Sequence, residues 1–166
     1  MKKIIILFFS LLLSFSAGAQ VKIGLFSYEQ VLSSMQDYQT VQSNLANLKS
    51  QYAAETQRVE DEFNKKYEEF LDGQRDFAPT ILQKRQSELQ ELMMKNISFK
   101  REAERLLRQA EQEAMAPVKA RLAAAVRAVG EAYGFTLILN TDGDNVQYVD
   151  AAMAEDVSAL IQSKLK

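Results

Sequence analysis

The sequence predicts a mainly helical α+β protein, in which a long antiparallel helical hairpin is inserted into a small body that contains strands. Three observations support this fold class. A helical spacing of apolar residues covers most of the chain, short β-branched runs stand near both of its ends, and glycine and proline together number only eight. Because so few residues interrupt regular structure, the chain can form long continuous helices.

The N-terminal segment has the pattern of an export signal. Met1-Lys2-Lys3 precedes an apolar run from Ile4 to Leu13, and Ala17-Gly18-Ala19 follows. A charged start, a short apolar stretch and a small-x-small site are typical of a signal peptide. The apolar run is shorter than the roughly 20 residues that cross a bilayer. We therefore expect residues 1–19 to be removed near Ala19, which leaves a soluble exported protein.

The next segment, residues 20–38, is predicted to begin the body. Val21-Lys22-Ile23-Gly24-Leu25-Phe26 alternates apolar residues with less apolar ones, as a short strand does. Ser27 is followed three residues later by Gln30, which is the spacing of a helix capping box. A strand followed by a short helix is expected here.

Residues 39–114 are predicted to form the hairpin arm. Apolar residues recur at helical spacings from Val41 to Leu71 and again from Leu82 to Ala110, and the segment from Gly73 to Pro79 separates the two series. The two helices, 39–72 and 80–114, have nearly equal lengths, so each should extend on the order of 50 Å at about 1.5 Å per residue. Pro117 is expected to bend or restart the return helix, because proline cannot donate a helical hydrogen bond.

The last segment, residues 115–166, should complete the body. Phe135-Thr136-Leu137-Ile138-Leu139 has a strong strand pattern after Gly134, and Asn145-Val146-Gln147-Tyr148-Val149 is expected to pair with it as a β-hairpin. Residues 154–165 have the spacing of an amphipathic helix.

The predicted body is too small to bury its own apolar residues, because three short strands make a marginal sheet. We therefore expect several chains to join their bodies in a cyclic homo-oligomer. The residues expected to form this contact share an apolar side chain on a predicted strand: Val21, Ile23, Leu25, Phe135, Leu137, Leu139, Val146 and Tyr148.

The composition argues against catalysis and against nucleic-acid binding. The chain has no histidine and no cysteine, so it lacks the usual proton shuttle, the thiol nucleophile and the common soft metal ligands. Asn140, Asp142 and Asp144 alternate like calcium ligands, but Asn145 stands where the EF-hand requires glycine, so a turn is expected. The formal charge of -2 does not suit a polyanion. No enzyme activity, cofactor or metal is predicted.

Several segments together resemble the Skp/OmpH family of periplasmic chaperones. They are Lys22-Ile23-Gly24-Leu25-Phe26, Glu29-Gln30-Val31-Leu32, Tyr38-Gln39-Thr40-Val41-Gln42-Ser43-Asn44-Leu45, Gly134-Phe135-Thr136-Leu137-Ile138-Leu139-Asn140 and Val146-Gln147-Tyr148-Val149-Asp150. The resemblance implies a trimer in the periplasm that holds unfolded outer-membrane β-barrel proteins without ATP, prevents their aggregation and helps to deliver them.

The arm departs from the basic arms of well-known family members. The span from Gln39 to Ala110 contains 12 Lys and Arg and 12 Asp and Glu. Apolar contact should therefore contribute more to holding a client. Aromatic and methionine side chains adapt to many partners. The candidate client-binding residues are Tyr67, Phe70, Phe77, Met94 and Phe99, whereas Val59, Phe63, Leu89 and Met93 are expected to join the two helices.

Two other interpretations remain open at this stage. The arm could be a coiled-coil scaffold of the cell envelope, although Glu55 and Glu62 interrupt the apolar heptads that a scaffold requires. Alternatively, its basic stretch could contact membrane lipid or lipopolysaccharide. That stretch contains Lys95, Lys100, Arg101, Arg105 and Arg108, but interleaved glutamates favour a solvated face with ion pairs.

Overall fold

A computed structural model describes residues 21–143 and 146–166, and the predicted signal peptide lies outside these residues. The described elements are β1 (Ile23–Phe26), α2 (Tyr28–Ser34), α3 (Gln36–Gly73), α4 (Pro79–Tyr133), β2 (Leu137–Asn140), β3 (Ala154–Asp156) and α5 (Ser158–Leu165). The chain forms two compact units. The arm unit comprises residues 36–120, and the body unit contains the described residues before 36 and after 120. The prediction of a mainly helical α+β fold is confirmed.

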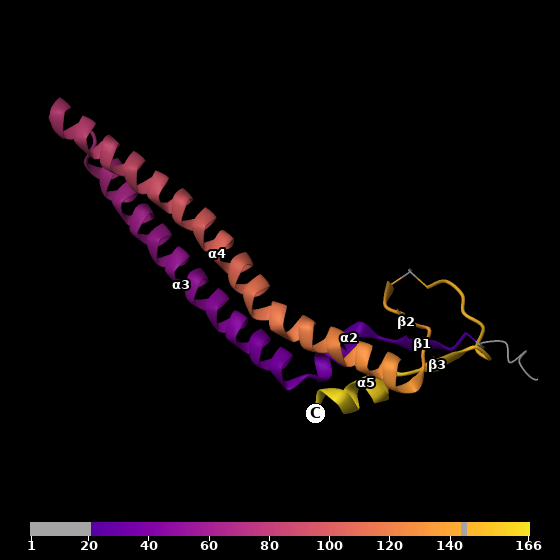
Figure 1. Cartoon of the computed structure of the whole chain (residues 1–166). Helices are drawn as coiled ribbons and strands as arrows, with labels where there is room; N and C mark the ends of the chain where they lie inside the picture. The colour runs from indigo at the N-terminus through magenta and orange to yellow at the C-terminus, as the bar shows by residue number, and fades with distance from the viewer. Residues whose placement is uncertain (1–20, 144–145) are drawn as a thin grey trace, which may run out of the picture. The chain divides into compact units, whose positions relative to one another are not determined.

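The body contains a three-stranded parallel sheet in the order β2-β1-β3 (Figure 1). Ile23 lies opposite Leu137 and Ala154, and Leu25 lies opposite Leu139 and Asp156. Parallel strands require a long connection, and here the whole helical hairpin connects β1 to β2.

The predicted hairpin of strands is wrong. Residues 146–149 form no strand, and Asn145 lies outside the described residues. The third strand is instead β3, which begins at Ala154, where the sequence pattern predicts helix. The C-terminal helix α5 therefore starts at Ser158, four residues later than expected.

Apolar side chains from the helices cover one face of this sheet. Gly24 and Phe26 of β1 are buried, and the nearest atoms to a Cβ added at Gly24 belong to Ile138, Val157 and Phe135. The side chains that are completely enclosed in the body are Val31, Leu122, Val129, Val157 and Ile161. Glycine at position 24 lets the strand approach this core closely.

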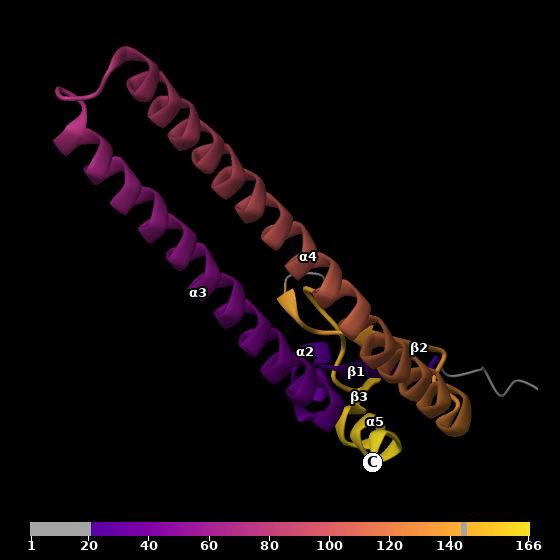
Figure 2. The same cartoon turned by 90° about the vertical axis from the view of Figure 1, so that its left-hand side faces the viewer.

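The arm is an antiparallel pair of helices, α3 and α4, which lie side by side in both views (Figures 1 and 2). The turn between them covers residues 74–78, and Pro79 occupies the first helical position of α4, where its missing N–H would have no partner inside the helix. The prediction that the return helix restarts at Pro117 is wrong, because α4 continues through Pro117 as a single helix.

Candidate functional site

The two arm helices join along a half-buried seam. Asn96 donates a hydrogen bond from Nδ2 to the carbonyl oxygen of Val59 across the seam, at 2.9 Å. The rings of Tyr52 and Phe99 pack with their centroids 6.3 Å apart. Phe99, which the sequence suggests as a client contact, is therefore a half-buried residue of the seam.

The tip of the arm is organised around Phe77. Its ring packs against Phe70 with a centroid separation of 6.4 Å and also lies over Gly73. A Cβ at position 73 would lie 2.5 Å from Phe77 Cζ, so glycine is required for this packing. Both candidate residues, Phe70 and Phe77, are half-buried here rather than freely exposed.

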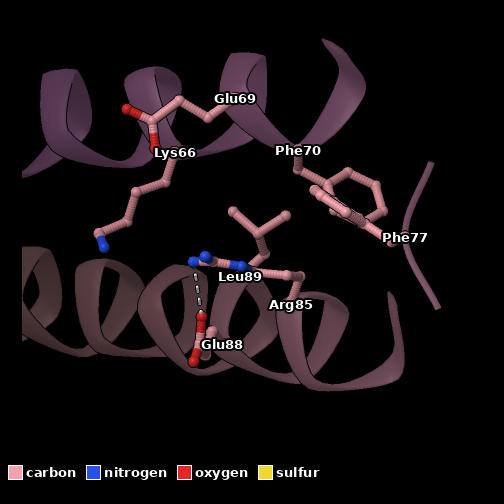
Figure 3. A pocket seen from close by; sticks show the side chains of 7 residues that line it. All are labelled: Lys66, Glu69, Phe70, Phe77, Arg85, Glu88 and Leu89. Atoms are coloured by element: carbon pink, nitrogen blue, oxygen red, sulfur yellow. Dashed lines mark hydrogen bonds and ion pairs between the residues drawn. The ribbon is translucent and has the colours of Figure 1, made fainter. Parts of the chain in front are cut away.

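Beside these rings the arm has a small hollow with about 420 Å³ of empty space, partly open to solvent. Leu89 and the two phenylalanine rings give it an apolar wall (Figure 3). Four charged side chains surround that wall, and they are Lys66, Glu69, Arg85 and Glu88. Arg85 pairs with Glu88 at 3.4 Å.

Large apolar side chains are exposed along the rest of the arm. Met94 is 58% exposed and Tyr67 45%, so these two candidate residues are available to a partner. Met93 is also 45% exposed, which corrects its predicted place in the seam. Three further large apolar residues are exposed, and the sequence pattern did not distinguish them from residues of the seam: Leu71, Ile81 and Ile97. The helical period shows which residues share a side of the helix, but it does not show which side faces the other helix. One known seam contact is needed to identify the exposed residues.

Most ion pairs of the arm join side chains of the same helix. Arg58 donates to Glu55 at 2.7 Å and also pairs with Glu62 at 3.5 Å. The hydrogen bond from Arg58 lowers the pKa of Glu55 below its usual range. The two glutamates that interrupt the heptads are thus solvated partners of one arginine.

The basic stretch of α4 is paired in the same way. Lys95 pairs with Glu91 at 2.6 Å, Arg105 with Glu102 at 2.7 Å, and Arg108 with Glu104 at 3.8 Å. The hydrogen bond from Arg105 also lowers the pKa of Glu102. Lys100 pairs with Glu60 of the other helix. These pairs reduce the positive charge that the stretch offers to a lipid headgroup.

The second face of the body sheet is the other apolar surface. Ile23, Leu25, Leu137 and Leu139 share this face, as the strand register shows, and none of them is buried. Leu137 is 48% exposed.

The remaining predicted contact residues of the body lie around the sheet. Val21 is 47% exposed and Tyr148 is 84% exposed, while Val146 and Phe135 are half-buried. Lys22 places its ammonium 4.1 Å from the centre of the Phe135 ring. The body therefore leaves much of its apolar surface open to solvent.

These features define an α+β protein with a helical hairpin arm and two exposed apolar surfaces, one on the arm and one on the body. The family model "Outer membrane protein (OmpH-like)" matches residues 22–165. The chain therefore belongs to the OmpH-like family, which is a family of periplasmic chaperones. Family membership therefore supports a chaperone role.

A solved structure has the same fold. It is the crystal structure of a candidate outer membrane chaperone (OmpH-like) from Caulobacter crescentus CB15, with a TM-score of 0.69. The sequences are 17% identical, and the match covers 90% of this chain and 86% of that chain. No curated protein matches the sequence.

Proposed function

We propose that this protein is an ATP-independent periplasmic holding chaperone, which binds unfolded outer-membrane β-barrel proteins, prevents their aggregation and helps to deliver them to the outer membrane. The observation that carries the proposal is the set of exposed large apolar side chains on a charge-balanced arm, which includes Tyr67, Leu71 and Met93. Exposed apolar surface on a soluble protein commonly marks an interaction site.

Methionine and aromatic side chains suit this task for a physical reason. They provide a large apolar area, and the methionine thioether is flexible and polarizable, so one surface can adapt to many unfolded sequences. Many weak contacts also allow a client to leave without an energy source. No nucleotide is therefore required in the proposed cycle.

We propose further that the body joins several copies, with a trimer as the expected assembly. The open face of the sheet supports this, because Ile23, Leu25, Leu137 and Leu139 would be buried together against another chain. Burial of apolar area contributes about 25 cal/mol per Å². An assembly would also place several arms around one client.

The place of action follows from the family and from the N-terminal pattern. We propose that residues 1–19 direct export to the periplasm and are removed near Ala19. In the described part of the chain, no helix is long and apolar enough to cross a membrane. Peripheral contact with lipid or lipopolysaccharide would then depend on the basic residues of the arm, most of which in the basic stretch already form ion pairs with glutamates.

The test uses the chain without residues 1–19 and a porin that is diluted from urea. Light scattering should show suppressed aggregation without ATP, and size-exclusion chromatography should show a stoichiometric soluble complex. A soluble unfolded protein serves as the comparison. If neither protein forms such a complex, the holding function is wrong; if a defined helical partner binds instead, the scaffold interpretation is favoured.

A further inference from the structure

One ion pair identifies a particular side of the arm. Glu60 of α3 pairs with Lys100 of α4, so both side chains must lie on the same side of the seam. Seven residues make almost two turns of an α-helix and return to nearly the same side. Positions seven residues from Glu60 and Lys100 therefore share this side.

Apolar residues occupy these equivalent positions toward the tip. Tyr67 is seven residues after Glu60, and Met93 is seven residues before Lys100. Because the helices are antiparallel, both side chains lie one heptad nearer the tip than the ion pair and on the same side of the seam. Leu71 and Ile97 each follow one of them by four residues and lie on its flank. We call Tyr67, Leu71, Met93 and Ile97 the apolar face.

The side chains of the apolar face are exposed, and one of them, Tyr67, packs on a half-buried ring. Their exposed fractions are 45%, 43%, 45% and 37% in that order. Phe63, which is half-buried, stacks on Tyr67 with ring centroids 6.0 Å apart and planes at 7°. The Tyr67 ring is thus held in place while its outer side remains open to solvent.

The opposite side of the seam has a different chemistry. Glu69 and Glu88 line the same hollow at the tip, one from each helix (Figure 3). Steps of seven residues from them reach only charged positions over the middle of the arm, which are Glu55, Glu62, Lys95 and Glu102. We call these six residues the charged face.

Two exposed apolar residues lie outside the apolar face. Ile81 is seven residues before Glu88, so it stands at the tip end of the charged side and is 46% exposed. Met94 is two residues before Asn96 of the seam, which places it about 160° around the helix and directed away from α3. Met94, a candidate from the sequence, is therefore not expected to contact the client, and Ile81 and Met94 serve as controls with comparable exposure.

We infer that an unfolded client lies as an extended, uncharged apolar segment along the apolar face, and that the charged face remains in water. This inference rests on the proposed holding function and assigns it to one side of the arm. The charged face carries five glutamates and one lysine, so an apolar segment placed there would remove carboxylates from water at a cost. The apolar face has no such penalty, and its one cross-seam ion pair is already formed.

The experiment compares two matched double variants of the mature protein. Tyr67→Ser with Met93→Ser changes the apolar face, and Ile81→Ser with Met94→Ser removes two apolar side chains of equal or greater exposure elsewhere. A porin diluted from urea is the probe, and its Kd is measured by fluorescence anisotropy. Circular dichroism and sedimentation confirm that helix content and assembly are unchanged.

We expect the apolar-face variant to raise Kd about tenfold, and the control variant to leave it within about twofold. An equal loss in both variants, or none in either while the natural chain still holds the porin, overturns the apolar face and leaves the holding function standing. If the natural chain itself does not bind porin, the holding function fails and the inference fails with it. A change in assembly mass for the apolar-face variant alone would assign this face to a second copy instead and would also overturn the inference.

Discussion

At the scale of single residues, three side chains cap the start of α2, and two of them come from the end of β2 and the turn after it. Ser27 Oγ accepts from the N–H of Gln30, Asn140 Oδ1 accepts from the N–H of Tyr28, and Asp142 Oδ2 accepts from the N–H of Glu29. These N–H groups have no partner inside the helix, so side-chain acceptors stabilise the helix end. The acidic turn at 140–142 therefore has a structural explanation.

The charge of Asp142 should make this contact depend on pH. The Ser27 hydroxyl and the N–H of Glu29 lower the pKa of Asp142. A carboxyl whose pKa is lowered by folding stabilises the fold above its unfolded pKa, about 3.9, and loses that effect as pH falls through the folded value. We expect Asp142→Asn to lower the Tm near neutral pH, and the difference from the natural chain to vanish in acid. A difference that is independent of pH would contradict the role of the charge.

Asn96 is the second residue whose role can be tested alone. It is half-buried in the seam and bonds to the Val59 carbonyl. Replacing it with alanine should lower the free energy of unfolding by roughly 0.5–1.5 kcal/mol, because one such hydrogen bond contributes about this much. Urea denaturation followed by circular dichroism measures the change. Ser98→Ala, on the exposed side of the same helix, is the control and should be nearly neutral.

At the scale of elements, the long helices were predictable and the sheet was only partly so. Apolar spacing is repeated many times over α3 and α4, so single exceptions such as Glu55 do not obscure it. Residues 146–149 alternate like a strand, but alternation describes side chains and does not supply a backbone partner. Ala154–Asp156 pairs with β1 despite a weak pattern, because its place is determined by contacts distant in sequence.

The sequence pattern predicted that the candidate site lies on the arm, but it did not predict which side of each helix faces solvent. Tyr67 and Met94 are exposed as expected, whereas Phe99 packs against Tyr52 in the seam and Met93 is exposed. Each step in sequence turns the side chain by about 100° around the helix, so a seam residue and an exposed residue can be direct neighbours in sequence. A single cross-helix contact, such as Glu60 with Lys100, is needed to fix that angle.

Pro117 provides a test of one element. Proline has no N–H to donate to the carbonyl of Glu113, yet α4 continues through it. Pro117→Ala should restore this hydrogen bond and raise the free energy of unfolding by up to about 3 kcal/mol. Thermal and urea unfolding would measure the increase. A loss of stability would show that the surrounding helix has adapted to proline.

At the scale of the whole molecule, the protein combines an arm of balanced charge with exposed apolar surface. The arm balances its acids and bases, and most of its ion pairs join side chains of the same helix, so little net field extends into solvent. Surface pairs of this kind contribute little to stability. The charged face thus consists of acids and bases in solvent, whereas the apolar face exposes Tyr67 and Met93.

The open face of the body sheet leads to the last prediction, which concerns assembly. Leu137 is 48% exposed in the single chain, so a lysine there should not disturb the folded body. If copies join through this face, the lysine would be buried without a partner, which costs several kcal/mol. We expect Leu137→Lys to reduce the mass found by sedimentation to that of one chain and to leave helix content unchanged. Tyr133, 46% exposed at the end of α4, provides the control, and Tyr133→Lys should remain assembled. An assembled Leu137→Lys variant would exclude this face as the contact. Assembly and client binding can then be separated, because the Leu137 variant retains every residue of the arm.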